Sequence, residues 1–480
     1  MSDVAPRATK IVATLGPASA APEVLERILH AGADVVRVNF SHGSPQEHTD
    51  VVARVREIAE RIGRSVGVLA DLQGPKIRIG TFESGSIVLD DGDPFVLDVD
   101  CPLGNQERVG LDYPELVQDV AVGDTLLLND GRVRMRVDRV DARAVACTVT
   151  QGGVLSNRKG INRQGGGLSA PALTAKDMED IRTAARFEAD FVAVSFPKNA
   201  ADMYMARELM RAAGGRALMI AKIERYEAIG ALDEILKASD GIMVARGDLA
   251  VEVGDASVPA LQKRMIRRAR ELNKLTITAT QMMESMIESP VPTRAEVSDV
   301  ANAVLDGSDA VMLSAETAAG RYPVETVEAM ARVCVEADRA ERMQLTEAFL
   351  EGNFARVDQT IAMSALFVAL HTKVKAVVSL TQSGSTALWM SRVDTSVPIY
   401  ALTPEERSRR RMSLYREVHP IVFTFHAVER EALLLEAEQL LLDIGVVERG
   451  DLIVLTIGEP IGKSGGTNTL KIVRVGEHWA

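Results

Sequence analysis

The sequence predicts an α/β protein built on a (β/α)8 TIM barrel, with one domain inserted into the barrel and another following it. Eight short apolar runs recur along the first two thirds of the 480-residue chain, and nearly all end in a residue that can take part in chemistry. Such runs, without polar alternation, are typical of parallel strands buried on both faces. Catalytic groups of these barrels follow the carboxyl ends of the strands, so the polar ends predict an active site. The runs are Lys10–Leu15, Asp34–Asn39, Val66–Asp71, Phe191–Ser195, Leu218–Lys222, Gly241–Ala245, Leu275–Thr280 and Ala310–Ser314.

The spacing of the runs predicts an insertion after the third strand. Other strand ends are 24 to 34 residues apart, whereas residues 71 and 195 are separated by 124. Because a βα unit needs about 30 residues, roughly 95 residues are inserted there. An insertion of that size at the catalytic rim can act as a lid. We therefore assign residues 1–71 and 171–345 to the barrel and 72–170 to the lid.

Within the insertion the hydrophobic pattern changes to period two, which predicts a small β-barrel domain of antiparallel strands. Apolar residues alternate over 133–137 and 145–149, and Asn129-Asp130-Gly131 is a hairpin signal. The glycine-rich segment 164–167 is a plausible hinge. After it, segment 174–177 has the pattern of a helix start.

Residues 346–480 predict a third, open α/β domain, because strand-like and helix-like segments alternate there. The expected strands are 374–380, 398–402, 420–425, 452–457 and 470–475, and the expected helices are 356–371, 383–391, 404–413 and 427–444.

Composition limits the possible partners and compartment. A net charge of −12 and an isoelectric point of about 5.3 argue against binding to nucleic acid or to a membrane surface, but allow a local basic pocket. No apolar run is long enough to span a bilayer, and the first residues lack a secretion-signal pattern. The three scattered cysteines show neither zinc spacing nor a disulfide framework, so we expect a cytoplasmic protein.

Two neighbouring strands of the predicted barrel end in charged residues. Lys222 and Glu224 end one strand, and Asp248 follows the next. Carboxylates are hard ligands that suit Mg²⁺ or Mn²⁺, with waters and substrate oxygens completing the coordination. Structural ion pairs are the competing interpretation, but three converging charges favour an active site.

Other strand ends carry weaker signals. Arg37 and Arg78 could clamp a phosphoryl group, because a guanidinium binds phosphate oxygens in pairs. A single histidine such as His42 is more often simply hydrogen-bonded. Thr280 can pass on a proton through its hydroxyl, whereas Ser314 could serve either catalysis or its own loop. Thr293 and Glu296 have the spacing of a capping box, which favours a structural role.

The third domain contains two candidate anion-binding stretches. Residues 381–386 follow a strand and open a helix, so their hydroxyls and free N–H groups can cradle an anion. Gly462-Lys463-Ser464 is not a P-loop, because Ile457 stands at the first glycine position and a strand follows. That stretch is either a glycine-rich effector loop or a plain surface loop.

Taken in order, these segments resemble the pyruvate kinase family over essentially the whole chain. Each motif alone is modest evidence, but all of them together with the insertion are specific. The matching segments are Thr9–Ser19, Arg37–Gly43, Asp71–Arg78, Lys159–Asn162, Ala221–Glu224, Met243–Leu249, Thr280–Met286, Pro292–Val304 and Met312–Ala318.

The resemblance implies transfer of a phosphoryl group from phosphoenolpyruvate to ADP, giving pyruvate and ATP in the last step of glycolysis. Such transfer needs positioning and charge neutralisation more than covalent catalysis. The roles implied by the resemblance are Mg²⁺ binding by Glu224 and Asp248, phosphoryl stabilisation by Lys222 and Arg37, enolate protonation by Thr280, a relay at Ser314, substrate binding at Ser195 and at Arg246, Gly247 and Asp248, and nucleotide binding by Pro17, His42, Arg78 and Lys159.

One segment departs from the family pattern. Many members have Asp-Thr-Lys-Gly-Pro-Glu where this chain reads Asp71-Leu72-Gln73-Gly74-Pro75-Lys76, and their glutamate accompanies an essential K⁺. The resemblance places that K⁺ at positions matching Asn39, Ser41, Asp71 and the carbonyl of Leu72. We expect the ammonium of Lys76 to replace K⁺, so that K⁺ is not required.

The third domain resembles the family's regulatory domain, which implies activation by a phosphorylated metabolite and a homotetramer. The matching effector positions are Thr381, Ser383, Gly384, Ser385 and Thr386, with Gly465 and Gly466 in the facing loop.

Two other classes of function are weighed against this one. A Mg²⁺-dependent enolate lyase or aldolase would share the metal carboxylates but would not need ADP. A catalytically silent sugar-phosphate sensor would need only the third domain, and it would have no physical reason to keep Lys222, Glu224, Asp248 and Thr280.

Overall fold

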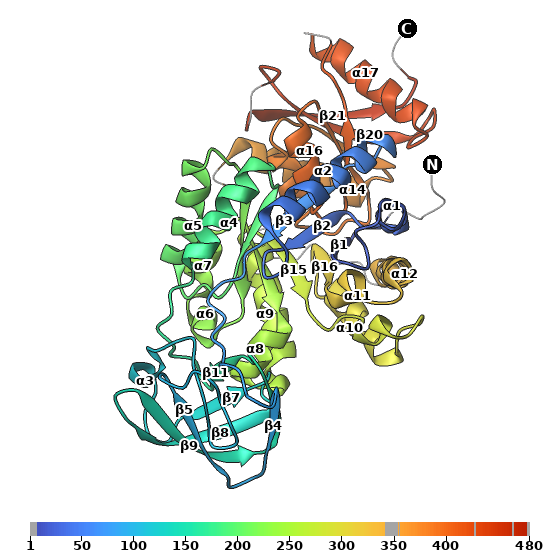
Figure 1. The fold of residues 1–480 in the computed structure, drawn as a ribbon. Helices are drawn as coiled ribbons and strands as arrows, with labels where there is room; N and C mark the ends of the chain where they lie inside the picture. The colour runs from blue at the N-terminus through green and yellow to red at the C-terminus, as the bar shows by residue number, and fades with distance from the viewer. Residues whose placement is uncertain (1–6, 341–353, 355, 427–428, 463–464, 478–480) are drawn as a thin grey trace.

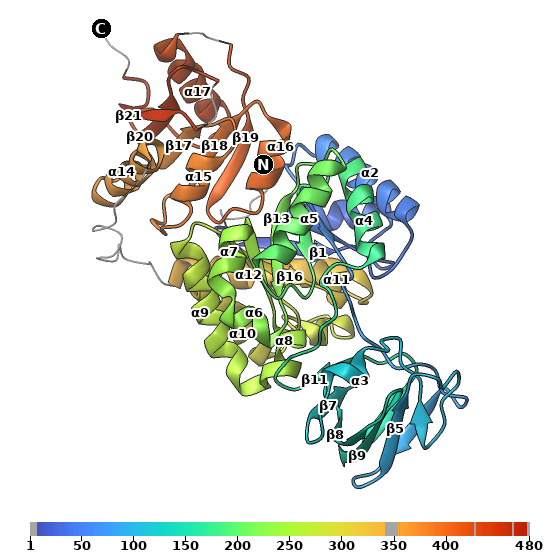
Figure 2. The same cartoon turned by 90° about the vertical axis from the view of Figure 1, so that its left-hand side faces the viewer.

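The computed structural model describes residues 7–340, 354, 356–426, 429–462 and 465–477, and it shows three parts (Figure 1). The barrel lies in the middle, with the inserted domain at one end and the C-terminal domain at the other; the view turned by 90° agrees (Figure 2). The lid therefore lies at the opposite end of the barrel from the third domain. Lys463 and Ser464 of the glycine-rich stretch lie outside the described residues.

The eight apolar runs form a closed barrel of parallel strands in the order β1-β16-β15-β14-β13-β12-β3-β2, which confirms the predicted fold class. Leu69 pairs with Phe191, so the barrel closes across the base of the insertion. All strand positions are buried except Arg37, Asn39, Leu218 and Lys222, which are half-buried. The strands are β1 (Lys10–Thr14), β2 (Val35–Asn39), β3 (Gly67–Asp71), β12 (Phe191–Val194), β13 (Leu218–Ile223), β14 (Gly241–Ala245), β15 (Leu275–Ala279) and β16 (Ala310–Leu313).

Helices cover the outside of the barrel. Both predicted capping boxes are present, because the Thr174 hydroxyl accepts from the backbone N–H of Asp177 and the Thr293 hydroxyl from that of Glu296. The barrel helices are α1 (Pro22–Ala31), α2 (Pro45–Arg61), α4 (Ala175–Arg186), α5 (Ala200–Ala212), α6 (Tyr226–Gly230), α7 (Leu232–Ala238), α8 (Arg246–Val253), α9 (Val258–Glu271), α10 (Arg294–Leu305), α11 (Ala315–Ala318) and α12 (Pro323–Ala340), with 3₁₀ turns η1 (Asp255–Ser257) and η2 (Glu284–Ile287).

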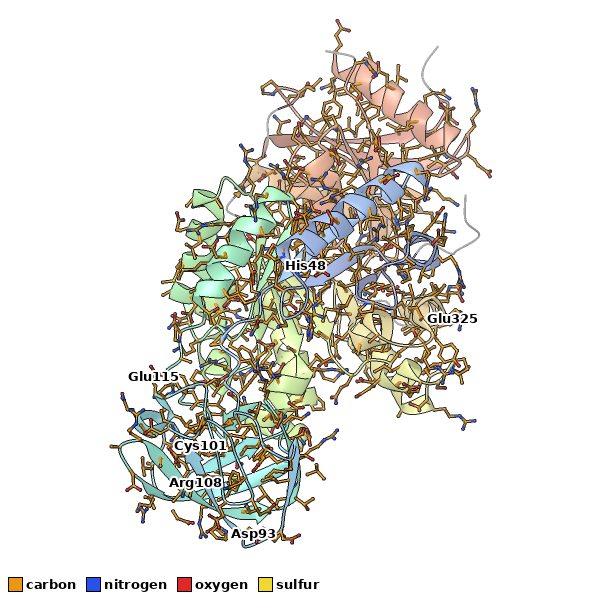
Figure 3. All side chains as sticks on the ribbon, in the orientation of Figure 1. His48, Asp93, Cys101, Arg108, Glu115 and Glu325 are labelled. Carbon is orange, nitrogen blue, oxygen red and sulfur yellow. The ribbon has the colours of Figure 1, made fainter. Side chains whose placement is uncertain are left out.

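The lid contains a six-stranded sheet, β11-β7-β8-β9-β5-β6, and a separate two-stranded sheet, β10-β4. The expected small barrel thus consists of two sheets, antiparallel except for the β5–β6 pair. Residues 129–131 form the predicted hairpin turn with positive φ, and Asp93, Cys101, Arg108 and Glu115 mark the lid in Figure 3. Its elements are β4 (Ser86–Leu89), β5 (Pro94–Asp98), β6 (Arg108–Val109), α3 (Leu116–Asp119), β7 (Thr125–Leu128), β8 (Val133–Val140), β9 (Ala144–Gln151), β10 (Gly153–Ser156) and β11 (Ile161–Arg163).

The C-terminal domain is an open five-stranded sheet in the order β19-β18-β17-β20-β21, in which β21 alone is antiparallel to its neighbour. Two strands begin earlier than predicted: β21 starts at Thr467 rather than at residue 470, and β19 starts at Val418 rather than at Pro420. An edge strand tolerates an internal proline, because the missing N–H faces no partner strand. The elements are α14 (Val357–His371), β17 (Ala376–Leu380), α15 (Ser385–Met390), β18 (Ile399–Thr403), α16 (Glu406–Met412), β19 (Val418–Val422), α17 (Arg430–Asp443), β20 (Leu452–Gly458) and β21 (Thr467–Arg474).

A buried carboxylate joins the C-terminal domain to the barrel. Asp309, which is 0% exposed, accepts hydrogen bonds from the backbone N–H of Thr276 at 2.9 Å and from Arg392 Nη1 at 3.0 Å. Burial alone would raise the pKa of Asp309, but the guanidinium of Arg392 outweighs it and holds the pKa below its usual range. Because charged hydrogen bonds are strong when buried, this contact fixes the domain at the amino ends of the barrel strands.

All three cysteines are free thiols. Across the described ranges, we find no helix with the length and apolar character needed to cross a membrane.

Candidate active site

A lysine stands at the centre of the charged cluster at the carboxyl end of the barrel. Lys222 Nζ, at the end of β13, lies 3.0 Å from Glu224 Oε1 and 3.2 Å from Asp71 Oδ1. It also donates to Ser195 Oγ at 2.8 Å, just after β12. Three strand ends predicted from sequence therefore meet at one ammonium group.

A second cation completes this cluster. Arg37 Nε, on β2, donates to Asp71 Oδ2 at 2.6 Å, and Arg37 Nη1 donates to Thr14 Oγ1 at 3.1 Å. Burial alone would raise the pKa of Asp71, but Lys222 and Arg37 lower it below its usual range. Burial would likewise lower the pKa of Lys222, yet Asp71 and Glu224 raise it overall. Lys222 is therefore a permanent positive charge in this site.

Glu224 is 1% exposed, so water does little to stabilise the negative charge of its carboxylate. Glu224 Oε2 accepts from the backbone N–H of Phe196 at 2.9 Å. Burial, followed by the neighbouring charge of Asp248, raises the pKa of Glu224 to about 7 despite Lys222. Two crowded hard oxygen donors of this kind fit a divalent cation, whose charge would relieve their repulsion.

Lys76 extends from the segment that enters the lid and reaches Asp248, one of these two carboxylates. Its Nζ lies 3.9 Å from Asp248 Oδ1, and both side chains are about one third exposed. This is the ion pair that Lys76 makes within the described part of the chain. Lys76 thus adds positive charge beside Asp248.

The residues expected to bind a monovalent cation lie near one another in the structure, but they already have hydrogen-bond or ion-pair partners. Asn39 Oδ1 accepts from the backbone N–H of Ser41 at 3.1 Å, and the carbonyl of Leu72 accepts from Ser195 Oγ at 2.7 Å. Asp71 is paired with Arg37 and Lys222. Two fixed cations therefore neutralise the carboxylate of this set.

Thr280 follows β15 and faces the amino end of α8. Its Oγ1 accepts from the backbone N–H of Gly247 at 2.8 Å and donates to the carbonyl of Ala279 at 2.6 Å. The backbone of Thr280 has a φ of +70°, which is uncommon for a β-branched residue and typical of functional sites. The hydroxyl is therefore held in a defined position at the rim.

The side chain of Arg246 fixes that conformation from behind. Arg246 Nη2 donates to the carbonyl of Thr280 at 2.7 Å, and Arg246 Nη1 donates to Asp299 Oδ1 at 2.7 Å. Asp299, on α10, was not among the residues singled out from the sequence. Nothing local in the sequence marks it, since the two partners are 53 residues apart.

Ser314 at the end of β16 is tied to its own loop. The carboxylate of Glu316 accepts from the backbone N–H of Ser314 at 2.7 Å and from that of Met283 at 3.2 Å. This arrangement supports the loop interpretation for Glu316, whereas a relay role for the hydroxyl of Ser314 stays a prediction.

The residues expected to bind nucleotide fall into two groups. Arg78 and Lys159 both belong to the lid: Arg78 pairs with Gly160, and the carbonyl of Lys159 accepts from the backbone N–H of Ile79 at 2.9 Å. Pro17 and His42 are exposed on loops after β1 and β2. The backbone N–H of Arg78 donates to Asp112 Oδ1 and its Nη1 donates to the carbonyl of Arg158, both in the lid, and a joint clamp with Arg37 stays a prediction.

A glutamate connects the lid to the barrel. The Glu252 side chain on α8 accepts from the backbone N–H of Tyr226 at 2.8 Å and from Asn162 Nδ2 at 3.4 Å, and its carbonyl accepts from Gly165 at 3.3 Å. Gly165 has a φ of +82°, as do its neighbours within the expected hinge at +79° and +95°. Glycine is required there because other residues rarely adopt such angles.

The expected effector residues gather at one end of the C-terminal sheet. Thr381 Oγ1 accepts from the backbone N–H of Gly384 at 2.9 Å, and the hydroxyls of Thr386 and Thr467 are 2.8 Å apart. Ser385 and Gly465 line a small pocket with them. Ser383 Oγ donates to Ser385 Oγ at 3.2 Å, and the backbone of Gly466 packs on Gly458.

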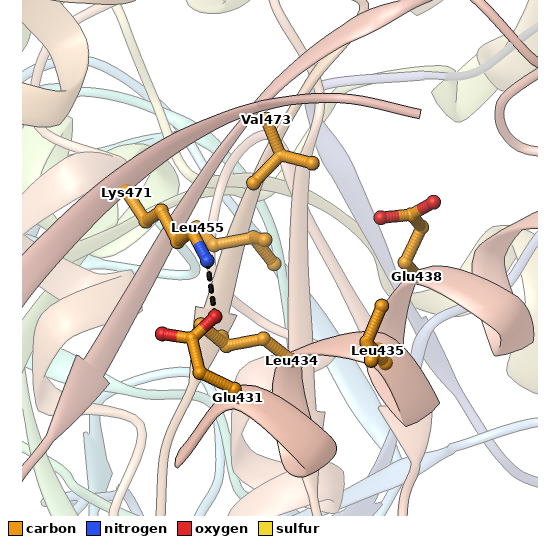
Figure 4. Close-up of a pocket in the computed structure, with 7 residues that line it drawn as sticks. All are labelled: Glu431, Leu434, Leu435, Glu438, Leu455, Lys471 and Val473. Carbon is orange, nitrogen blue, oxygen red and sulfur yellow. Dashed lines mark hydrogen bonds and ion pairs between the residues drawn. The ribbon is translucent and has the colours of Figure 1, made fainter. Parts of the chain in front are cut away.

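A separate pocket of about 290 Å³ lies between α17 and strands β20 and β21 (Figure 4). Leu434, Leu455 and Val473 make it largely apolar, and an ion pair between Glu431 and Lys471 crosses it. Because its lining is largely apolar, this pocket does not suit an anion.

Comparisons with known proteins agree with this site. Residues 6–327 match the family model described as pyruvate kinase, barrel domain, and residues 359–473 match that of pyruvate kinase, alpha/beta domain. The chain is 52% identical over 475 residues to pyruvate kinase II of Salmonella typhimurium, covering 98% of this chain and 99% of that protein. It is 52% identical to a pyruvate kinase of Haemophilus influenzae, covering 94% and 96%, and 42% identical to one of Geobacillus stearothermophilus, covering 97% and 80%.

Proposed function

Because the chain belongs to the pyruvate kinase family, we propose that it transfers the phosphoryl group of phosphoenolpyruvate to ADP at the cluster of Lys222, Glu224 and Asp248. The observation that carries this assignment is the contact of Lys222 with Glu224 at 3.0 Å and with Asp71 at 3.2 Å. A positive charge held between strand ends is what a phosphoryl group in transfer needs.

Lys222 and Arg37 neutralise the substrate's phosphoryl oxygens. The bond between phosphorus and the enol oxygen breaks, and a terminal oxygen of ADP forms the new bond to phosphorus. The charge left on the enolate is then quenched by a proton at its methylene carbon. Ser195 supports Lys222 through its 2.8 Å hydrogen bond, so the ammonium keeps its position during transfer.

Mg²⁺, or Mn²⁺, fits the carboxylates of Glu224 and Asp248, and when bound it supplies Lewis-acid neutralisation of oxygen charge. The raised pKa of Glu224, to about 7, reflects burial and the repulsion of Asp248 that such a cation would offset. The carboxylate of the substrate lies against the amino end of α8, at the backbone of Arg246 and Gly247.

Thr280 is the group that hands a proton to the enolate. Its hydroxyl is held by Gly247 and Ala279, and the carbonyl of Thr280 is held by Arg246. A hydroxyl is too weak an acid to act alone, so Thr280 relays a proton that solvent replaces, with Ser314 as a further relay.

ADP binds between the barrel rim and the lid, at Pro17, His42, Arg78 and Lys159. Since Arg78 and Lys159 are lid residues, movement of the lid about 164–167 brings their charges to the nucleotide phosphates. The present contacts of Glu252 with Asn162 and Gly165 are the ones such movement would break or remake.

K⁺ is not required, because fixed cations occupy its neighbourhood. Asp71 is paired with Arg37 and Lys222, and Lys76 lies 3.9 Å from Asp248. The ammonium of Lys76 therefore supplies the charge that K⁺ brings in relatives with a glutamate at this position.

The C-terminal loop of 381–386 with Gly465 and Gly466 binds a phosphorylated activator, and the enzyme acts as a cytoplasmic homotetramer. The hydroxyl-lined pocket at Ser385, Thr386 and Thr467 supports the first statement. A phosphoenolpyruvate saturation curve unchanged by every sugar phosphate and nucleoside monophosphate would contradict it.

The site assignment is tested by Lys222→Met, with Lys237→Met on the outer helix α7 as a matched control. We expect ADP-dependent pyruvate formation to fall at least about a thousandfold in the first variant, because a transition-state charge loses its partner. The exposed Lys237 should leave the rate unchanged. Substantial activity in a folded Lys222→Met protein would refute the assignment.

A further inference from the structure

A single buried carboxylate joins the two chain segments that connect the lid to the barrel. Asp177, in the first turn of α4, is 0% exposed. Its Oδ1 accepts from the backbone N–H of Gly74 at 3.0 Å, on the segment that enters the lid. Its Oδ2 accepts from the backbone N–H and from the hydroxyl of Thr174, at 2.8 and 2.6 Å, where the chain has returned from the lid. The entry and the exit of the lid therefore meet at one side chain.

The capping box of α4 explains only part of these contacts. Such a box needs its third helical side chain to accept from the backbone N–H of the N-cap residue, which Oδ2 of Asp177 does. The bond from Gly74 lies outside the box and joins residues 103 positions apart in the sequence. In the capping box of α2, the exposed Glu47 accepts from its own N-cap residue Ser44 and, among the described residues, makes no bond of this second kind. Helix capping alone therefore does not account for the position of Asp177.

Burial makes this arrangement depend on the hydrogen-bond donors around Asp177. The donors are N–H and hydroxyl groups, and the described part of the chain gives Asp177 no ion-pair partner. A buried carboxylate is costly unless it is hydrogen-bonded, and the amino end of a helix adds partial positive charge, so Asp177 binds its donors strongly. Without this carboxylate, the N–H of Gly74 would be buried with no acceptor. The turn at Gly74 would then have to move or open.

The turn held at Gly74 carries two members of the charged cluster. It follows Asp71, whose Oδ1 lies 3.2 Å from Lys222 Nζ. It precedes Lys76, whose Nζ lies 3.9 Å from Asp248 Oδ1 and whose backbone N–H donates to the carbonyl of Gly74 at 3.0 Å. A shift of this turn would therefore reach both the catalytic lysine and one of the metal carboxylates.

We propose that Asp177 is a positioning residue for phosphoryl transfer, which ties the turn at Gly74 to the start of α4 so that Asp71 and Lys76 keep their places in the charged cluster. Asp177 acts through this turn and not by contact with the substrate. The inference rests on the proposed function, because the step that it positions is the transfer at Lys222. It adds to that function a residue whose sequence pattern indicates only a helix start.

Two measurements on the full-length protein test this role: backbone hydrogen exchange in segment 72–78, followed by mass spectrometry, and the kinetics of pyruvate formation. In Asp177→Ala the N–H of Gly74 loses its acceptor, so we expect exchange in this segment to become at least about fivefold faster. We expect kcat to fall at least about tenfold, because small displacements of catalytic groups are costly. The KM for phosphoenolpyruvate should stay within about threefold of the wild-type value, since the carboxylate of the substrate is held at α8.

Thr174→Val is the matched control, because it removes the hydroxyl of the same capping box and leaves the carboxylate of Asp177 in place. It should lower the urea midpoint of unfolding, as loss of a helix cap does, but keep wild-type exchange in 72–78 and wild-type kcat. Asp177→Asn covers the case in which Asp177→Ala does not fold. It keeps the size of the side chain but offers one acceptor oxygen where the carboxylate offers two, so its kcat should fall only as far as exchange in 72–78 rises.

Three results would overturn the proposal. They are unchanged exchange in 72–78 in the Asp177 variants, faster exchange there with a wild-type kcat, or the same changes in Thr174→Val, which would reduce Asp177 to a helix cap. Failure of the proposed function is a different result, because the wild type itself would then form no pyruvate that depends on ADP. That result would overturn the role in transfer as well, whereas an active wild type with unaffected variants would overturn this inference alone.

Discussion

The loop after β3 supplies a sharp test of how the fold positions the catalytic lysine. Gly74 has a φ of +68°, and a Cβ added to it would lie 2.7 Å from Ser195 Cβ and 3.0 Å from Phe196 Cδ2. Ser195 holds Lys222, and the backbone of Phe196 holds Glu224. Gly74→Ala therefore pushes directly on both supports of the site.

Gly63 provides a matched control, because it has the same φ of +68° but nothing within 4 Å of an added Cβ. Gly63→Ala should cost only the conformational term, about 1 kcal/mol. Gly74→Ala adds overpacking of about 1–3 kcal/mol, for a total of about 2–4 kcal/mol. The difference between the two variants isolates the contacts with Ser195 and Phe196.

Stability is measured by urea unfolding. The kcat for pyruvate formation is measured without urea, at a temperature where both variants are folded. Because a displacement of about 1 Å can cost about 100-fold in rate, we expect kcat of Gly74→Ala to fall about 10- to 100-fold. Gly63→Ala should keep the wild-type kcat. Equal stability and equal kcat in the two variants would refute the reasoning.

Three further outcomes are expected. Lys76→Glu should create a K⁺ requirement: activity in K⁺-free buffer should fall about 5- to 30-fold and be restored by K⁺. The reason is that a charge about 4 Å from Asp248 is worth about 1–4 kcal/mol, and the partial exposure of both side chains favours the lower half of that range. An equal response of variant and wild type to K⁺ would contradict this. Asp299→Asn should lower kcat about tenfold without changing Mg²⁺ affinity, because Arg246 loses the partner that orients it toward Thr280, and an unchanged kcat would show that Asp299 positions nothing. Burial, followed by the charge of Asp394, raises the pKa of Glu417 at the domain junction from 4.5 to about 7. The folded state therefore holds this proton more tightly than the unfolded state, and stability is lost as the pH rises from about 4.5 through 7. In denaturant unfolding, Glu417→Gln should be more stable than the wild type at pH 8 but not at pH 4. An equal gain in stability at both pH values would argue against the titration of Glu417.

Much of the barrel could be predicted because its strands are continuous apolar segments with polar ends. That pattern is local, and the closed parallel topology then forces the strand ends together. Lys222, Glu224 and Asp71 were found in this way, and the structure places Lys222 against both carboxylates. The edge strand β19 was misplaced by two residues, because Pro420 suggests a strand start when the neighbouring strand is unknown.

The residues that support the site were harder to predict, because their partners are distant in the sequence. Asp299 reaches Arg246 from α10, and the Glu316 side chain reaches Met283 from α11. The contact of Lys76 with Asp248 also depends on how the lid meets the barrel. Likewise, no local pattern distinguishes one closed lid barrel from two sheets, since strand pairing is set by long-range register.

The most direct test of the central claim is pyruvate formation from phosphoenolpyruvate by the wild type, with ADP and Mg²⁺ each omitted in turn and with K⁺ present throughout. The account predicts that pyruvate forms with equal amounts of ATP only when both are supplied, and that chelation of the metal abolishes activity that added Mg²⁺ or Mn²⁺ restores. Pyruvate released without ADP, or at an unchanged rate after complete metal removal, would contradict the assignment of phosphoryl transfer to Lys222, Glu224 and Asp248.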